Sequence, residues 1–366
     1  MRITLIIHSM SAGGAERAMA TMANYWAAGQ QAVTLLTFDD GKIPSFYELN
    51  PGVVHRPLGI ASDSRGVLSA IRNNFRRVSA LRRAIRESKP DVIVSLMTPS
   101  NVLTILASRG LGIPVVVEEQ VDPAKHFAGR AWDLLRRWTY AHASALVILA
   151  ERSLNFFPPK LRALCHVIPN PIVVTPPACP RLLINGGARR VVAMGRLDRQ
   201  KGFDLLLEAF GRISPAHPEW DLEIWGEGPQ RAALEALVSR LQLATRVRLP
   251  GLTDRPHETF RQCDLFVLSS RYEGFPLVLC EALACGLPVI SFDCPTGPRE
   301  IVRHGIDGVL VPAEDVDSLA AALDGLMRDE AKRLRLGKSA PEVLRRFGAQ
   351  VVMQQWDELL KALVHR

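Results

Sequence analysis

Short apolar runs alternate along the chain with segments in which apolar residues recur at helical spacing. In the first half, the runs that predict strands are Ile3–His8, Val33–Phe38, Val92–Leu96, Val115–Glu118 and Ala145–Leu149. A helical pattern over Glu16–Ala28 lies between the first two runs. Because buried parallel strands read as continuous apolar runs and need long crossover connections, the alternation predicts a parallel sheet with helices on both faces.

A proline-rich stretch from Pro158 to Pro180 interrupts this alternation and is typical of a linker. The elements predicted beyond it are strands at Val191–Met194, Leu222–Trp225, Val247–Leu249, Leu265–Leu268, Val289–Phe292 and Gly308–Val311, and helices at Phe203–Ile213, Gln230–Leu241 and Ala349–Val364. We therefore predict an α/β fold of two Rossmann-like, doubly wound parallel-sheet domains. The predicted limits are 1–172 and 190–345 for the domains, 173–189 for the linker and 346–366 for a final helix.

The formal net charge of +8 favours an anionic partner, such as a phosphorylated substrate or a membrane surface. Aromatic residues are sparse and Lys and Arg form no long run, so we expect no nucleic-acid partner. The six cysteines form no CxxC pair, which disfavours a zinc site and is consistent with the cytoplasm. Because no apolar run approaches the length of a membrane span, any membrane contact should be peripheral.

The first candidate motif, Ser11–Arg17, follows the first predicted strand and opens a helix. Its glycines, Gly13 and Gly14, allow a sharp turn and a close approach to a ligand, and the helix N-terminus attracts anions. A plain strand-to-helix turn explains the motif equally well. Because the motif is not GxGxxG, it argues against a nicotinamide oxidoreductase.

The second motif, Met194–Gly202, occupies the equivalent place in the second half. One turn separates Arg196 from Lys201, so both cations can converge on one anion. The Arg can hold phosphate with two parallel hydrogen bonds, and the Lys supplies a compact charge. The alternative is a solvated basic turn.

The third motif, Glu273–Gly286, carries two glutamates in an otherwise apolar setting. Glu281 lies within a predicted apolar helix, where an unpaired carboxylate is costly, and sugar hydroxyls are natural partners for it and for Glu273. The segment that begins this helix, with free N–H groups suited to phosphate, is Gly274, Phe275, Pro276 and Leu277. The alternative is two exposed glutamates on a helix surface.

Together, the stretches Gly-Gly-Ala-Glu-Arg, Gly-Arg-Leu-Asp-Arg-Gln-Lys-Gly, Gly-Glu-Gly-Pro and Ser-Ser-Arg-Tyr-Glu-Gly-Phe-Pro-Leu-Val-Leu-Cys-Glu-Ala-Leu-Ala-Cys-Gly resemble family 4 glycosyltransferases over almost the whole chain. The resemblance implies the GT-B fold, in which the two domains face a cleft and the C-terminal helix crosses back to the first domain. It also implies a UDP- or GDP-sugar donor, retention of anomeric configuration, and neither a bound metal nor another cofactor.

The resemblance also implies roles for the motif residues. Arg196 and Lys201 would hold the leaving diphosphate, and Glu281 would bind the ribose hydroxyls. Glu273 would contact the hydroxyls of the donor sugar, and the Gly13-Gly14 turn would approach the diphosphate from the first domain.

The N-terminal half most resembles enzymes that extend polyprenyl-diphosphate-linked glycans or exopolysaccharide repeat units. Such enzymes often read Ser-Glu-Arg after the strand that begins at Val115, whereas this chain reads Glu118-Glu119-Gln120 and lacks that cation. We expect transfer of a hexose or N-acetylhexosamine to a glycan hydroxyl, with Glu119 or His126 orienting the acceptor. The alternatives are a nucleotide-sugar epimerase or a phosphorylase on the same fold, and a non-catalytic scaffold.

The segment Ile71–Lys89 predicts an amphipathic basic helix. Its apolar stripe is Ile71, Phe75, Val78 and Ile85, and the flanking cations are Arg72, Arg76, Arg83 and Arg86. Such a helix can lie on the anionic inner leaflet of the cytoplasmic membrane or hold a lipid diphosphate, although a packed surface helix is an equal alternative. A second candidate contact comprises Trp132, Arg136, Arg137 and Trp138.

Overall fold

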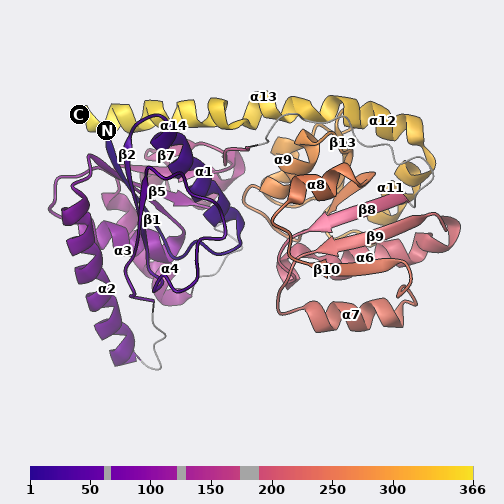
Figure 1. Cartoon of the computed structure of the whole chain (residues 1–366), viewed down its shortest axis with the longest axis horizontal. Coiled ribbons are helices and arrows are strands. Elements are labelled where there is room, and N and C mark those ends of the chain that lie inside the picture. The colour runs from indigo at the N-terminus through magenta and orange to yellow at the C-terminus, as the bar shows by residue number, and fades with distance from the viewer. Residues whose placement is uncertain (62–66, 122–128, 174–188, 366) are drawn as a thin grey trace. The chain divides into compact units, whose positions relative to one another are not determined.

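A computed structural model of the chain describes residues 1–61, 67–121, 129–173 and 189–365 (Figure 1). The chain divides into two compact units, one of Met1–Pro171 with Ala349–Arg366 and one of Ile172–Gly348. Each unit contains a fully parallel sheet covered by helices, so the predicted α/β fold class is confirmed. Residues 174–188, which form most of the predicted linker, lie outside the described residues.

The first unit is built on a seven-stranded sheet of order β3-β2-β1-β4-β5-β6-β7. Its strands are β1 (Arg2–Ile7), β2 (Ala32–Thr37), β3 (Val53–Pro57), β4 (Val92–Leu96), β5 (Val115–Glu119), β6 (Ala145–Ile148) and β7 (Cys165–Val167). Its helices are α1 (Gly14–Ala28), α2 (Val67–Ser88), α3 (Thr98–Ser108), α4 (Arg130–Thr139), α5 (Pro159–Arg162) and α14 (Ala349–Val364). The strand order reverses between β1 and β4.

The two faces of this sheet are buried by different helices. On one face, Trp26 of α1 packs edge-to-face on Trp356 of α14, with ring centroids 6.2 Å apart. The indole N–H of Trp26 also donates to Asp357 Oδ1 at 2.8 Å. The last helix therefore returns to the first unit, as the resemblance implied. Helices α2 and α3 bury the other face (Figure 1).

The second unit is built on a six-stranded sheet of order β10-β9-β8-β11-β12-β13. Its strands are β8 (Arg189–Met194), β9 (Trp220–Trp225), β10 (Val247–Gly251), β11 (Leu265–Leu268), β12 (Val289–Asp293) and β13 (Gly308–Pro312). Its helices are α6 (Phe203–Ile213), α7 (Arg231–Arg240), α8 (Pro256–Arg261), α9 (Leu277–Ala284), α10 (Pro298–Ile301), α11 (Val316–Arg328), α12 (Glu330–Ser339) and α13 (Val343–Phe347).

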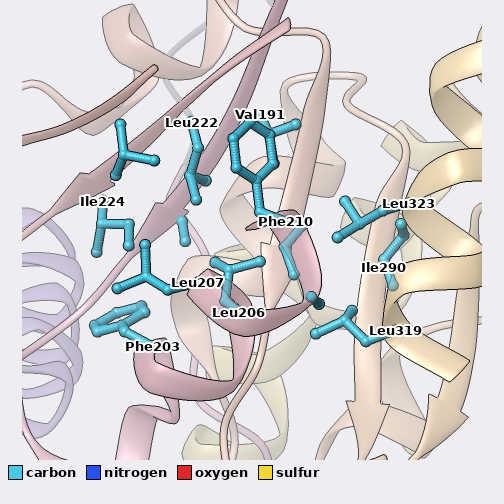
Figure 2. Close-up of a cluster of buried hydrophobic side chains, with 14 of the residues drawn as sticks. Val191, Phe203, Leu206, Leu207, Phe210, Leu222, Ile224, Ile290, Leu319 and Leu323 are labelled. Carbon is cyan, nitrogen blue, oxygen red and sulfur yellow. The ribbon is translucent and has the colours of Figure 1, made fainter. Parts of the chain in front are cut away.

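Helix α6 supplies much of the core of the second unit. Its apolar residues Phe203, Leu206, Leu207 and Phe210 recur at the spacing that places them on one helical face. Figure 2 shows these side chains packed with residues of the strands and of α11. This packing fixes the position at which α6 begins, directly after the Met194–Gly202 turn.

Candidate active site

In the second unit, the strand order reverses between β8 and β11. Ligands of open parallel sheets bind beyond the carboxyl ends of the strands at such a reversal, because the connections there diverge to opposite faces. The turn after β8 and the loop after β11 carry the second and third motifs, Met194–Gly202 and Glu273–Gly286. Fold and motif therefore point to one location in this unit.

The turn after β8 has a defined backbone geometry. The carboxylate of Asp198 accepts a hydrogen bond from the Lys201 amide at 3.3 Å, which caps a short 3-10 turn. Gly202 follows in the left-handed region, with φ of 61°, and a Cβ there would overlap the carbonyl oxygen of Ser269. Glycine is thus required for two reasons, and the turn lies directly against the loop after β11.

Lys201 and Glu273 form an ion pair between these two segments. Lys201 Nζ lies 2.6 Å from Glu273 Oε1, and the side chains are 18% and 6% exposed. The hydroxyl of Ser270 donates to the same carboxylate oxygen at 2.6 Å. The hydroxyl of Thr296 donates to the backbone carbonyl of Glu273. The structure therefore brings Lys201 and Glu273 together and fixes the carboxylate.

Arg196 belongs to the same turn but is placed differently. Its side chain is 72% exposed, and its Nε lies 3.7 Å from Asp198 Oδ2. An exposed guanidinium held by one loose ion pair is free to reorient. The structure therefore presents Lys201 as the fixed cation of the site and Arg196 as an adjustable one.

Glu281 is buried within α9, as predicted. The helix begins at Leu277 and is apolar apart from this carboxylate. Burial raises the pKa of the neighbouring Cys280 thiol well above its usual range, and the charge of Glu281 raises it further. Phe275 is itself buried and packs edge-to-face on Phe347, so its backbone is held firmly where the helix begins.

Two more loops contact the site, and their sequences, Trp225–Pro229 and Thr296–Glu300, fit either supporting turns at strand ends or purely structural ones. A Cβ at Gly297, where φ is 91°, would lie 2.8 Å from the Gly274 carbonyl oxygen. A Cβ at Gly226 would overlap the carbonyl oxygen of Gly195. The missed side chains that hold the site are Asp198, Ser270, Arg271 and Thr296. Asp198, Ser270 and Arg271 lie inside the stretches that carry the family resemblance, but nothing in those stretches shows which residues they contact.

In the first unit, the Gly13-Gly14 turn is partly occupied by the protein itself. Helix α1 begins at Gly14, two residues before the predicted start. The Tyr47 hydroxyl accepts from the Gly13 amide at 3.2 Å and donates to the Gly13 carbonyl at 3.0 Å. A Cβ at Gly13 would overlap the carboxylate of Glu16, whereas the same position at Gly14 is open. A side chain at Gly14 would therefore meet open space, whereas one at Gly13 would require Glu16 to move.

Glu119 lies at the end of β5 in a buried hydrogen-bond network. Its carboxylate accepts from Tyr140 OH at 2.5 Å and from Thr98 Oγ1 at 2.9 Å. A nitrogen of Arg136, itself buried, lies 3.9 Å from the same carboxylate. A cation from α4 thus stands near Glu119, although position 120 carries none. His126, the other candidate acceptor residue, lies outside the described residues.

The neighbours of Glu119 are also buried. Gln120 Nε2 donates to Glu118 Oε1 at 2.8 Å, and the side-chain amides of Gln120 and Asn170 hydrogen-bond to each other at 2.8 and 3.0 Å. Burial raises the pKa of Glu118 to about 8, although the hydrogen bond from Gln120 lowers it. Glu118 therefore keeps its proton at neutral pH in the folded protein.

Helix α2 carries the predicted basic residues on its surface. Arg72, Arg76, Arg83 and Arg86 are all exposed. The predicted apolar stripe divides, because Ile85 is buried in the core whereas Phe75 is 71% exposed. The second predicted contact needs correction: Arg136 faces inward, and the exposed residues of α4 include Leu134, Arg137 and Trp138. No helix in the described parts of the chain is long and apolar enough to span a bilayer.

Comparison with known proteins agrees with this geometry. The family model described as "Glycosyl transferase 4-like domain" matches residues 13–177, and the model "Glycosyl transferases group 1" matches residues 179–343. HepE from Anabaena, solved in complex with UDP-glucose, is similar to the chain with a TM-score of 0.81 and 22% identity, over 99% of each chain. The two doubly wound parallel-sheet units and this likeness show that the chain has the GT-B fold.

The chain belongs to the family 4 type of these glycosyltransferases. An alpha-1,4-N-acetyl-D-galactosaminyltransferase from Campylobacter jejuni, named for a GalNAc-GalNAc-diNAcBac-PP-undecaprenol acceptor, is 27% identical over 98% of each chain. An "exopolysaccharide phosphotransferase" from Streptomyces coelicolor is 36% identical over 78% of this chain. The chain spans 30% of the length of that relative. The comparisons do not favour the epimerase alternative.

Proposed function

We propose that the protein is a retaining glycosyltransferase that moves a hexose or N-acetylhexosamine from a UDP- or GDP-sugar to a hydroxyl of a lipid-linked glycan. The observation that carries this proposal is the Lys201–Glu273 pair at the strand reversal of the second unit. A fixed ammonium group suits a diphosphate, and a fixed carboxylate suits sugar hydroxyls. The relatives with UDP-glucose and undecaprenol-linked substrates in their names support the donor and acceptor classes.

In the proposed reaction, the bond between the anomeric carbon and the diphosphate oxygen breaks. A bond to the acceptor oxygen forms on the same face of the sugar, and the acceptor proton passes to the leaving phosphate. The ammonium of Lys201 lies where it can stabilise the charge that develops on this phosphate, and Arg196 can swing in to assist. The chain requires neither a metal nor another cofactor in this scheme.

The role proposed for Glu281 gives a direct test of the donor site. Glu281→Gln removes a charged acceptor of ribose hydroxyls, and hydrogen bonds to charged groups contribute about 1.5–3 kcal/mol each. We expect the affinity for UDP or GDP, whichever the wild type binds, to fall by about ten- to a hundredfold. Thermal-shift titration of both nucleotides and their sugars measures this change.

Glu219→Gln, which changes an exposed glutamate of the same unit, is the matched control and should bind like the wild type. The melting temperature without ligand shows whether each variant is folded. If Glu281→Gln is folded and binds the nucleotide as tightly as the wild type, the ribose role is wrong. If the wild type binds no nucleotide or nucleotide sugar, the transferase proposal itself fails.

We further propose that the enzyme acts at the inner leaflet of the cytoplasmic membrane as a peripheral protein. The exposed arginines of α2 supply positive charge, and the exposed Phe75 supplies an apolar side chain. Both features favour binding to an anionic bilayer. Each arginine near such a surface contributes roughly 1 kcal/mol. Replacing Arg72, Arg76, Arg83 and Arg86 by Gln should therefore lower partitioning to anionic liposomes on the order of a hundredfold or more.

A matched control variant removes the same number of positive charges from the second unit. The exposed arginines suited to it are Arg240, Arg255, Arg328 and Arg335. Co-sedimentation with liposomes that contain anionic lipid should drop for the α2 variant and change little for the control. Equal losses would mean that net charge alone drives binding, and unchanged binding of the α2 variant would contradict the membrane role.

A further inference from the structure

Arg271 links the two segments of the candidate donor site. It lies in the loop after β11, two residues before Glu273, yet its side chain reaches the turn after β8. Its Nη1 donates to the Arg199 carbonyl at 2.8 Å, and the guanidinium donates to both carboxylate oxygens of Asp204 at 2.8 and 2.7 Å. Its Nε donates to Glu314 Oε2 at 3.0 Å. One side chain therefore connects three separate segments.

Three further hydrogen bonds to backbone carbonyls join the same two segments. The Arg271 amide donates to the Gln200 carbonyl at 2.8 Å, and Gln200 Nε2 donates to the Tyr272 carbonyl at 3.0 Å. The Ser269 hydroxyl donates to the Lys201 carbonyl at 2.9 Å. Gln200 and Lys201 are thus hydrogen-bonded to Ser269, Arg271 and Tyr272, which precede Glu273, so the two segments are held together.

The Arg271–Asp204 contact is strong for a pair near the surface. The Arg271 side chain is 14% exposed, and the two parallel hydrogen bonds use the planar fork that only arginine offers. Burial alone would raise the pKa of Asp204, but hydrogen bonds and charge from Arg271 overcome it, so that the pKa is lowered. Asp204 therefore remains ionised and paired at neutral pH.

We propose that Arg271 and Asp204 form a clamp that fixes the separation of Lys201 and Glu273 and thereby sets the affinity for the diphosphate part of the donor. This inference rests on the proposed function. Arg271 and Asp204 are positioning residues, because their contacts go to the protein and not to the atoms that react. A preorganised anion site loses affinity when the groups that hold its ligands in place are removed.

The test is calorimetric titration of Arg271→Gln, Asp204→Asn and the double variant with the nucleoside diphosphate that the wild type binds. We expect the dissociation constant to rise by about tenfold in each single variant. The double variant should bind no more weakly than either single variant, because the two residues act as one unit. Binding of the monophosphate of the same nucleoside should change less. Arg271→Lys, which keeps the charge but not the fork, should be intermediate.

Arg212→Gln is the control, because Arg212 forms an exposed ion pair with Asp317 elsewhere in the unit. The clamp would be overturned if the losses of affinity in the two single variants added up in the double variant. It would also be overturned if Arg271→Gln bound the nucleoside diphosphate within twofold of the wild type. If Arg271→Gln is unfolded, the milder Asp204→Asn and Arg271→Lys variants carry the test. A wild type that binds no nucleoside diphosphate would overturn the proposed function, which is a separate outcome.

Discussion

Lys201→Met should lower kcat/KM for the donor about a thousandfold. Lys201 is the fixed cation of the site, with its ammonium 2.6 Å from Glu273. Removing one preorganised group that stabilises a developing anion typically costs about a hundred- to a thousandfold in rate. Methionine fills a similar volume without the charge. The measurement is the initial rate of nucleoside diphosphate release with a glycan acceptor present.

Stability must be separated from catalysis in this experiment. Lys201→Met leaves the buried Glu273 carboxylate without its partner, and breaking a buried pair in this way costs about 3–5 kcal/mol. Adding Glu273→Gln removes the uncompensated charge, so the double variant should regain stability but not activity. Arg212→Gln serves as the control with normal activity. A Lys201→Met enzyme within threefold of the wild type would refute the role proposed for this residue.

Glu118→Gln should stabilise the protein at alkaline pH. The folded chain holds the Glu118 proton up to a pH of about 8, whereas the ordinary pKa is 4.5. Between these values the folded state binds one more proton than the unfolded state, so the stability of the wild type falls by about 1.4 kcal/mol per pH unit. The stabilising effect of the proton is complete below the ordinary pKa and is lost as pH rises through 8.

The glutamine variant lacks this titration, and its side-chain oxygen can still accept from Gln120. Urea unfolding of the wild type and variant from pH 5 to pH 8 should therefore give a difference that grows with pH in favour of the variant. The contributions of all other titrating groups are the same in both proteins, so they cancel in that difference. Glu151→Gln, an exposed site in the same unit, should show no such trend. A difference that is constant across this range would show that Glu118 titrates normally.

Sequence patterns predicted the interior of the fold more accurately than its edges. The buried strands β4 and β11 were predicted with the bounds that the structure has, because continuous apolar runs mark strands covered on both faces. The edge strands β3 and β7 were missed. Strand β3 alternates between half-buried and exposed residues and ends in a proline, so it lacks an apolar run. Most other bounds differ by one or two residues.

The sequence predicted which residues belong to the candidate site, but not which of them contact one another. Motif spacing selected Lys201 and Glu273, but nothing local shows that a side chain meets another 72 positions away. That contact follows from the pairing of β8 with β11, which is a tertiary property. In the same way, Arg136 was interpreted as a surface cation because only the fold shows that it faces Glu119.

The most direct test of the proposed retaining transfer is product analysis by NMR. The purified enzyme would be incubated with UDP- or GDP-sugars, with and without a polyprenyl-diphosphate-linked glycan, and the anomeric signals followed. We expect nucleoside diphosphate to be released when acceptor is present, and the new glycosidic bond to keep the anomeric configuration of the donor. An inverted product, a nucleotide sugar isomerised without acceptor, or no consumption of any nucleotide sugar would contradict the proposed transfer.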